Sequence, residues 1–196
     1  CTSVTSMGRS PVWTTSGEAG GGEGANEAWA ANAEWWLAAM LPRTRGLALT
    51  ADDVLVTRGS QMALDLVARA LLRPGDVVAV ESLGYRPAWE ALRAAGARLV
   101  PVPLDEDGIV VERLAELAEK LPVRAVYLTP HHQYPTTVVL RAPRRLALLA
   151  LARKHRFAVI EDDFDHEFHY EGRPILPLAA RAPESEVYIG PFAKVL

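Results

Sequence analysis

The stretch VLVTRGSQMALDLVARALLRPGDVVAV, residues 54–80, decides the fold class of this chain. It opens with the apolar, β-branched run 54–57, which predicts a short strand. Ser60 can then cap a helix whose apolar residues recur at helical spacing. The turn Pro74-Gly75-Asp76 follows, and the apolar run 77–80 predicts a second, buried strand. A strand, a helix and a strand in this order indicate one unit of a parallel sheet.

The same alternation continues along the rest of the chain. We predict further helices near 86–95, 111–121 and 143–155, and further strands at 98–102, 125–128, 157–160 and 187–189. Apolar strands separated by amphipathic helices are typical of an α/β fold, a mostly parallel sheet with helices on both faces. Ligands of such sheets bind at the carboxyl ends of the strands.

The first 42 residues have a different character. Residues 1–26 are rich in Ser, Thr and Gly, so we expect an irregular, linker-like segment with little order. Residues 27–41 carry tryptophan, leucine and methionine at roughly helical spacing, which predicts a helix that ends at Pro42. We therefore divide the chain into an N-terminal segment, 1–42, and a partial domain, 43–196.

Composition restricts the class of protein. The chain has 196 residues, of which 49% are hydrophobic and 23% charged, and a net charge of −3, which is typical of one globular domain and not of a basic nucleic-acid-binding surface. No apolar run reaches the roughly 18 to 20 residues of a membrane span. Cys1 is the only cysteine, which suits a reducing cytoplasm. Because the chain begins with Cys1 and stops just after Lys194, we expect a fragment.

Two polar clusters follow predicted strands early and midway in the chain. Gly59-Ser60-Gln61 precedes the first helix, where a glycine and free N–H groups suit an anion, although Ser60 could merely cap the helix. The loop Thr129–Thr136 contains two prolines, two histidines and a tyrosine, and rigid polar loops of this kind often carry site residues. Its alternative interpretation is a tight turn with solvated histidines.

Two further clusters lie toward the end of the chain. The acidic run Glu161–Asp165 ends a buried strand, and such dense like charge is consistent with a nearby cation or charged ligand; an exposed acidic turn is the alternative interpretation. His166 and His169 are three residues apart beside these acids and could bind a metal. We nevertheless expect none, because no second ligand set has metal-site spacing. Lys194 follows an apolar segment that could desolvate and activate it, or it is a surface charge.

Taken in order, these clusters resemble the signature of fold-type-I pyridoxal-phosphate-dependent aminotransferases, in particular the MocR branch of GntR-type regulators. The matching elements are Gly59-Ser60-Gln61, Gly84-Tyr85, Thr129–Pro135, Glu161–Asp165 and Gly190–Lys194. The resemblance covers residues 43–196. It implies a truncated large domain of that fold and the cofactor pyridoxal 5'-phosphate.

The resemblance also implies a role for each matching residue. Lys194 would be the catalytic lysine, which forms a Schiff base with the cofactor and moves protons, and Asp162 would pair with the pyridine nitrogen. The other residues would contact the rest of the cofactor: Ser60 and Gln61 its phosphate, Tyr85 its ring face, and His132, Gln133 and Tyr134 the edge that bears the phenolic oxygen.

Some positions depart from the family pattern. Phe164 stands where the family usually has a tyrosine that bonds the phenolic oxygen, and Thr137 replaces the usual glycine. Pro191 and Ala193 replace hydroxyl residues before the lysine. The arginine for the substrate carboxylate and the winged-helix domain of MocR regulators are not in the sequence.

Two functions are consistent with these motifs. The first is amino-group transfer between an amino acid and a 2-oxo acid. The alternative is a sensor domain of a MocR-type transcriptional regulator, which binds the cofactor and an amino compound and reaches DNA only through a winged-helix domain; an inactive fragment of either is the third interpretation. The family implies a homodimer for the full-length parent and no membrane association. We expect the 196-residue chain alone not to transaminate.

Overall fold

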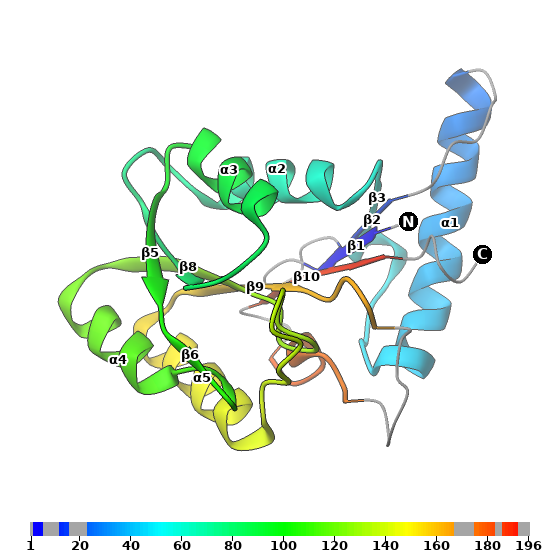
Figure 1. Ribbon diagram of the computed structural model, residues 1–196. Coiled ribbons are helices and arrows are strands. Elements are labelled where there is room, and N and C mark those ends of the chain that lie inside the picture. Colours follow the sequence, from blue (N-terminus) through cyan, green and yellow to red (C-terminus); the bar gives the residue numbers. More distant parts are fainter. Residues whose placement is uncertain (1, 6–11, 16–22, 167–174, 183–185, 192–196) are drawn as a thin grey trace.

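The computed structural model describes residues 2–5, 12–15, 23–166, 175–182 and 186–191. An eight-stranded sheet runs through this part of the chain, and helices cover both of its faces (Figure 1). The predicted α/β fold is confirmed.

The sheet has the strand order β3-β2-β1-β10-β9-β8-β4-β5. Neighbours among β10, β9, β8, β4 and β5 pair in parallel, whereas β1 is antiparallel to β10. The strands are β1 (Thr2–Thr5), β2 (Val12–Thr15), β3 (Val54–Thr57), β4 (Val77–Glu81), β5 (Arg98–Val102), β8 (Val123–Leu128), β9 (Ala158–Asp162) and β10 (Glu186–Pro191), and β6 (Leu104–Asp105) and β7 (Gly108–Ile109) form a separate hairpin.

Each face of the sheet has its own layer of helices. On one face α2 (Ser60–Leu71) and α3 (Arg86–Ala94) pack over the sheet, and on the other α4 (Val111–Lys120) and α5 (Ala142–His155) do so (Figure 1). The long helix α1 (Glu23–Arg45) lies beside the end of the sheet that contains β3. Short 3-10 turns occur at Ala51–Asp53 and Leu178–Ala180.

Alternation along β9 positions the polar residues at its end. Ile160 belongs to the core beneath α2 and α3, whereas Val159 belongs to the core beneath α4 and α5. Successive side chains of a strand point to opposite faces. Asp162 therefore lies on the same face of the sheet as Ile160, whereas Glu161 and Asp163 lie on the same face as Val159. The pairing extends one residue beyond the strand, since Asp163 N donates to Ile189 O at 2.8 Å.

The start of the chain differs from the expectation. Residues 2–5 and 12–15 form β1 and β2 within the sheet, where we expected a loose segment. Their Thr and Val residues have strand propensity, which the surrounding Ser and Gly obscure. The predicted helix is also longer: α1 begins at Glu23 and continues past Pro42 to Arg45. A proline near a helix end removes only one hydrogen bond, so the last turn is retained.

None of the helices in the described ranges is long and apolar enough to cross a membrane.

Candidate functional site

A buried aspartate with one open oxygen lies at the end of β9. The Tyr127 hydroxyl donates to Oδ2 of Asp162 at 2.7 Å, while Oδ1 is buried and has no hydrogen-bond partner within the described part of the chain. Burial raises the pKa of Asp162 to about 6, and the hydrogen bond from Tyr127 opposes that rise. The protein thus fixes one carboxylate oxygen and leaves the other for a ligand.

A second buried acid, Glu81, joins the end of β4 to the loop after β8. Its Oε2 accepts hydrogen bonds from the backbone N–H of Thr129 at 3.1 Å and from the Thr129 hydroxyl at 3.0 Å. Burial raises the pKa of Glu81 to about 7 despite these bonds, and the negative charge of Asp162 adds to the rise. Glu81 therefore holds the loop next to Asp162.

Gln133 fastens the same loop. Its side-chain amide donates to Leu83 O at 2.7 Å, and its Oε1 accepts from the Thr136 hydroxyl at 2.6 Å. Thr137 adopts φ +61°, the left-handed region that glycine favours. The side chain of Gln133 is thus engaged with the loop and with the β4–α3 connection.

Three aromatic rings from three loops meet edge to face beside Asp162. The ring centroids of Tyr85 and Tyr134 are 5.9 Å apart, and those of Tyr134 and Phe164 are 6.2 Å apart. Tyr85 and Tyr134 keep 38% and 45% of their surface exposed, so they can still contact a bound molecule. Such rings offer an apolar surface to a planar ligand.

The start of α2 offers an anion site. Gly59 precedes the helix with φ +91°, and no heavy atom lies within 4 Å of where a Cβ would stand. No side chain caps the helix, so Ser60 does not act as the predicted cap. The first N–H groups of a helix that lack a cap suit a phosphate. Gln61 Nε2 donates to Pro87 O at 3.1 Å and links α2 to α3.

His132 forms a pair with Asp165. Nδ1 of His132 lies 2.6 Å from Oδ2 of Asp165, and the two side chains are 27% and 17% exposed. His132 is therefore paired with Asp165 and is not the freely solvated histidine that the alternative interpretation of the loop assumed.

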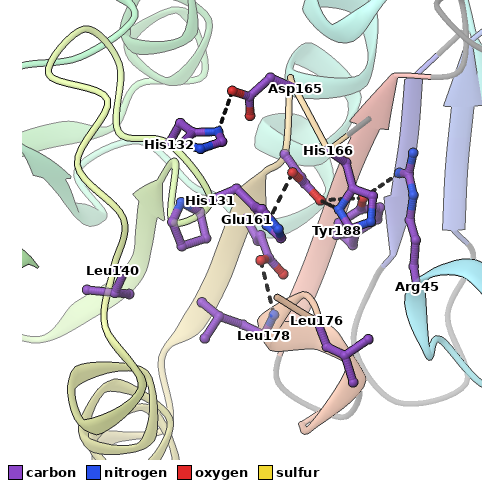
Figure 2. Close-up of polar contacts among 12 residues, drawn as sticks. Arg45, His131, His132, Leu140, Glu161, Asp165, His166, Leu176, Leu178 and Tyr188 are labelled. Atoms are coloured by element: carbon purple, nitrogen blue, oxygen red, sulfur yellow. Dashed lines mark hydrogen bonds and ion pairs between the residues drawn. The ribbon is translucent and has the colours of Figure 1, made fainter. Parts of the chain in front are cut away.

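On the opposite face, Asp163 is the centre of a buried polar cluster, and Figure 2 labels its neighbours His131, His166 and Tyr188. Its Oδ2 lies 2.7 Å from His166 Nδ1 and accepts a hydrogen bond from Tyr188 Oη at 2.7 Å, and its Oδ1 lies 3.4 Å from His131 Nδ1. Arg45 donates to Tyr188 Oη at 2.5 Å. Burial alone raises the pKa of Asp163, but the hydrogen bond from His166 and the nearby His131, His166 and Arg45 outweigh it and lower the pKa below its usual range.

Two more buried ionic groups are structural. Glu161 accepts hydrogen bonds from the backbone N–H groups of Leu178 and Ala179 at 3.0 and 3.2 Å. Burial and the adjacent Asp163 raise the pKa of Glu161 to about 7. Arg145 donates to three backbone carbonyls, those of Leu140, Leu176 and Pro130, at 2.8, 3.0 and 2.9 Å. Glu161, Asp162 and Asp163 are all buried, so this part of the acidic run is not an exposed turn.

Contacts at the strand ends link several of the residues singled out in the sequence. Gln61 connects α2 to α3. The Tyr85–Tyr134 ring pair connects the start of α3 to the loop after β8, and the Tyr134–Phe164 ring pair connects that loop to the segment after β9. Lys194 lies outside the described residues. Sequence reasoning missed Tyr127 and Glu81, although each is a polar residue at or near the end of an apolar strand.

Solved structures of aminotransferases share this fold. LysN, the alpha-aminoadipate aminotransferase of Thermus thermophilus in complex with N-(5'-phosphopyridoxyl)-L-leucine, matches with a TM-score of 0.77 and 32% identity over 85% of this chain and 42% of that chain. The kynurenine aminotransferase of Pyrococcus horikoshii, in complex with PMP, matches with a TM-score of 0.76 and 37% identity over 82% of this chain and 41% of that chain.

The family follows from the sequence match. A model of the family "Aminotransferase class I and II" matches residues 15–194, so this chain belongs to the class I and II aminotransferase family, which is pyridoxal-phosphate-dependent. The probable rhizopine catabolism regulatory protein MocR of Rhizobium meliloti is 35% identical over 161 residues, 82% of this chain and 32% of MocR. Aromatic-amino-acid aminotransferase 1 of Thermococcus litoralis is 37% identical over 150 residues, 74% of this chain and 36% of that enzyme.

These matches confirm the resemblance to both aminotransferases and MocR-type regulators. The chain spans about a third of the length of the curated relatives it matches.

Proposed function

We propose that this chain supplies the pyridoxal-phosphate-binding part of a domain that transfers an amino group between an amino acid and a 2-oxo acid. One observation carries the proposal: Oδ1 of Asp162 is buried and without a hydrogen-bond partner among the described residues, while Tyr127 fixes Oδ2. A buried acceptor that is left open costs free energy unless a donor meets it. The protonated pyridine nitrogen of the cofactor is a donor of the right charge.

The rest of the site fits the same cofactor. Ser60 and the backbone N–H groups at the start of α2 would hold the phosphate, Tyr85 would contact the ring face, and Lys194 would be the attachment point. When bound, pyridoxal phosphate supplies an electron sink for the carbanion at the substrate Cα. His132 and Tyr134 would line the ring edge that bears the phenolic oxygen, whereas Gln133 would act through the shape of the loop that it fastens.

Asp162 would keep a proton on the pyridine nitrogen. With its pKa near 6, the carboxylate is mostly ionised at neutral pH, and burial strengthens its interaction with a cation. The Tyr127 hydroxyl orients the carboxylate and favours the ionised form. Lys194 would take the Cα proton and return it, which is the role that the family resemblance implies.

The relatives also favour a second function, a sensor domain of a MocR-type regulator. MocR is 35% identical, and the pyridoxine biosynthesis transcriptional regulator PdxR of Corynebacterium glutamicum is 36% identical over 156 residues. In this case the same site would bind the cofactor and an amino compound, and a winged-helix domain elsewhere in the parent would bind DNA. The family resemblance further supports a homodimeric parent and a cytoplasmic location as proposals.

A cofactor titration tests the proposal. The purified chain is titrated with pyridoxal phosphate and followed by visible absorbance, and the isosteric variant Asp162→Asn is compared with it. We expect saturable binding that weakens by at least about tenfold in Asp162→Asn, because a charged hydrogen bond is worth about 1.5 to 3 kcal/mol. Asp65→Asn, which removes an exposed carboxylate on α2, is the matched control. Equal affinity of the wild type and Asp162→Asn would contradict the proposal.

Turnover separates the two functions. With the full-length parent, an enzyme converts an amino acid and a 2-oxo acid into the exchanged pair. A sensor instead shows a saturable change of cofactor absorbance with the amino compound and no multiple turnover.

A further inference from the structure

We propose that His131, Asp163 and His166 form a binding site for a divalent transition-metal ion of the zinc type. The site lies on the face of β9 opposite to the proposed cofactor site, and it is independent of the proposed function. His131 comes from the loop after β8, Asp163 directly follows β9, and His166 belongs to the turn that comes next.

The three side chains already lie close to a coordination geometry. Their ligand atoms all lie within 4.8 Å of one another, and the two imidazole rings are 4.8 Å apart between centroids. An ion with tetrahedral bonds of about 2.0 to 2.2 Å separates its ligands by roughly 3.3 to 3.6 Å. Oδ1 of Asp163 lies 3.4 Å from His131 Nδ1, which agrees with this separation. Oδ2 of Asp163 lies 2.7 Å from His166 Nδ1, a hydrogen-bond distance, so the His166 ring must move outward by roughly 0.6 to 0.9 Å when an ion binds.

The kinds of ligand select the kind of metal. Two imidazoles and one carboxylate match zinc, cobalt or nickel, whereas calcium and magnesium prefer a set made entirely of oxygens. All three residues are at least 95% buried, so bulk water competes little for the ion. A neutral imidazole and an ionised carboxylate are the protonation states that a metal requires.

Surrounding groups hold the central ligand in place (Figure 2). Arg45 donates to Tyr188 Oη, and the Tyr188 hydroxyl donates in turn to Oδ2 of Asp163. Hydrogen bonds of this kind to a metal ligand orient it and are typical of metal sites. Arg45 thus supports Asp163 indirectly, through the Tyr188 hydroxyl.

The backbone around the ligands is fixed as well. Asp163 N donates to Ile189 O at 2.8 Å, and Arg145 binds Pro130 O, the carbonyl just before His131, at 2.9 Å. Ligands on a fixed backbone lose little entropy when an ion binds. A metal here would tie the loop after β8 to the end of β9, which is a structural role.

The alternative occupant is a proton. One protonated imidazole paired with Asp163 would give the same arrangement without a metal. The test must therefore detect the ion itself.

Metal binding is measured directly on the tag-free, chelator-treated chain without pyridoxal phosphate, which itself binds metals. Zn²⁺ is titrated by calorimetry and Co²⁺ by visible absorbance. We expect one equivalent of Zn²⁺ to bind with a Kd of about 1 μM or tighter, and Co²⁺ to give a d–d band that Zn²⁺ displaces. A folded wild-type chain that binds neither ion would overturn the proposal and favour the proton.

Variants assign the ligands. His131→Asn and His166→Asn should each weaken Zn²⁺ binding by about 100-fold or more, because loss of even an outer-shell partner costs 10- to 100-fold. His155→Asn removes a histidine at the end of α5, near Glu119, and should leave binding unchanged. Full retention of binding in both ligand variants, or an equal loss in His155→Asn, would place the metal elsewhere. Circular dichroism checks that each variant is folded. If a variant is unfolded, the titration of the wild-type chain still shows whether the protein binds the metal.

Discussion

Glu81→Gln should remove a pH dependence of stability that the wild-type chain carries. Glu81 is buried at the end of β4, and its pKa is raised from 4.5 to about 7, chiefly by burial. Between these two values the folded chain keeps a proton that the unfolded chain releases. The free energy of unfolding therefore falls as the pH rises through this window. The stabilisation that comes from the raised pKa of Glu81 is fully present only below pH 4.5.

The size of the effect follows from the shift. A pKa change from 4.5 to about 7 corresponds to about 3 kcal/mol of unfolding free energy, since one unit is worth about 1.4 kcal/mol. The substituted glutamine would have the shape of the protonated acid and could accept the same two hydrogen bonds from Thr129, but it does not titrate. The variant should thus gain about 3 kcal/mol relative to the wild type between pH 4.5 and pH 8.

Urea denaturation at pH 4.5 and pH 8 measures this difference. Acids that do not interact with Glu81 titrate equally in both proteins, so their contributions cancel in the difference between the two unfolding free energies. Glu106→Gln, in the exposed turn between β6 and β7, is the matched control and should show no such pH-dependent gain. A gain of less than about 1 kcal/mol for Glu81→Gln would show that water reaches Glu81 and that burial does not govern its titration.

Three further substitutions test other contacts. Tyr127→Phe removes the donor to Asp162, so pyridoxal phosphate should bind about tenfold more weakly at neutral pH; absorbance titration measures this, and an unchanged Kd would refute the role of the hydroxyl. Gly190→Ala places a Cβ against Arg45 and Tyr188, and overpacking should lower the unfolding free energy by about 1 to 3 kcal/mol in urea; a neutral effect would mean that these side chains can move aside. Arg145→Met leaves three backbone carbonyls without their donor, and we expect a loss of about 3 kcal/mol or more in the same assay, with less than about 1 kcal/mol counting against it.

The sequence predicted those parts of the fold whose residue pattern depends on one segment alone. The run 77–80 is apolar at every position because helices cover both faces of β4, and that pattern predicts a parallel sheet. Asp162 and Tyr85 were placed at strand ends for the same reason. The short strands β1 and β2 were missed because four residues within a Gly- and Ser-rich context carry too little periodicity.

Contacts between distant segments could not be predicted. Tyr127 and Asp162 are 35 residues apart, and nothing in either segment fixes the register that brings them together. The same holds for His131, which meets Asp163 and His166 only when β8 and β9 are paired. The hydrogen bond from the Gln133 side chain to Leu83 O also joins segments 50 residues apart, and no pattern in either segment indicates it.

The strand order has a consequence for how the chain is made. β10 lies between β9 and β1, although it is the last of the described strands to leave the ribosome. Until residues 186–191 emerge, β9 has an open edge of unpaired backbone N–H and C=O groups, and β1 and β2 have no partner that joins them to it. Open apolar edges pair readily with other chains. The open edge of β9 is therefore covered only when β10 takes its place in the sheet.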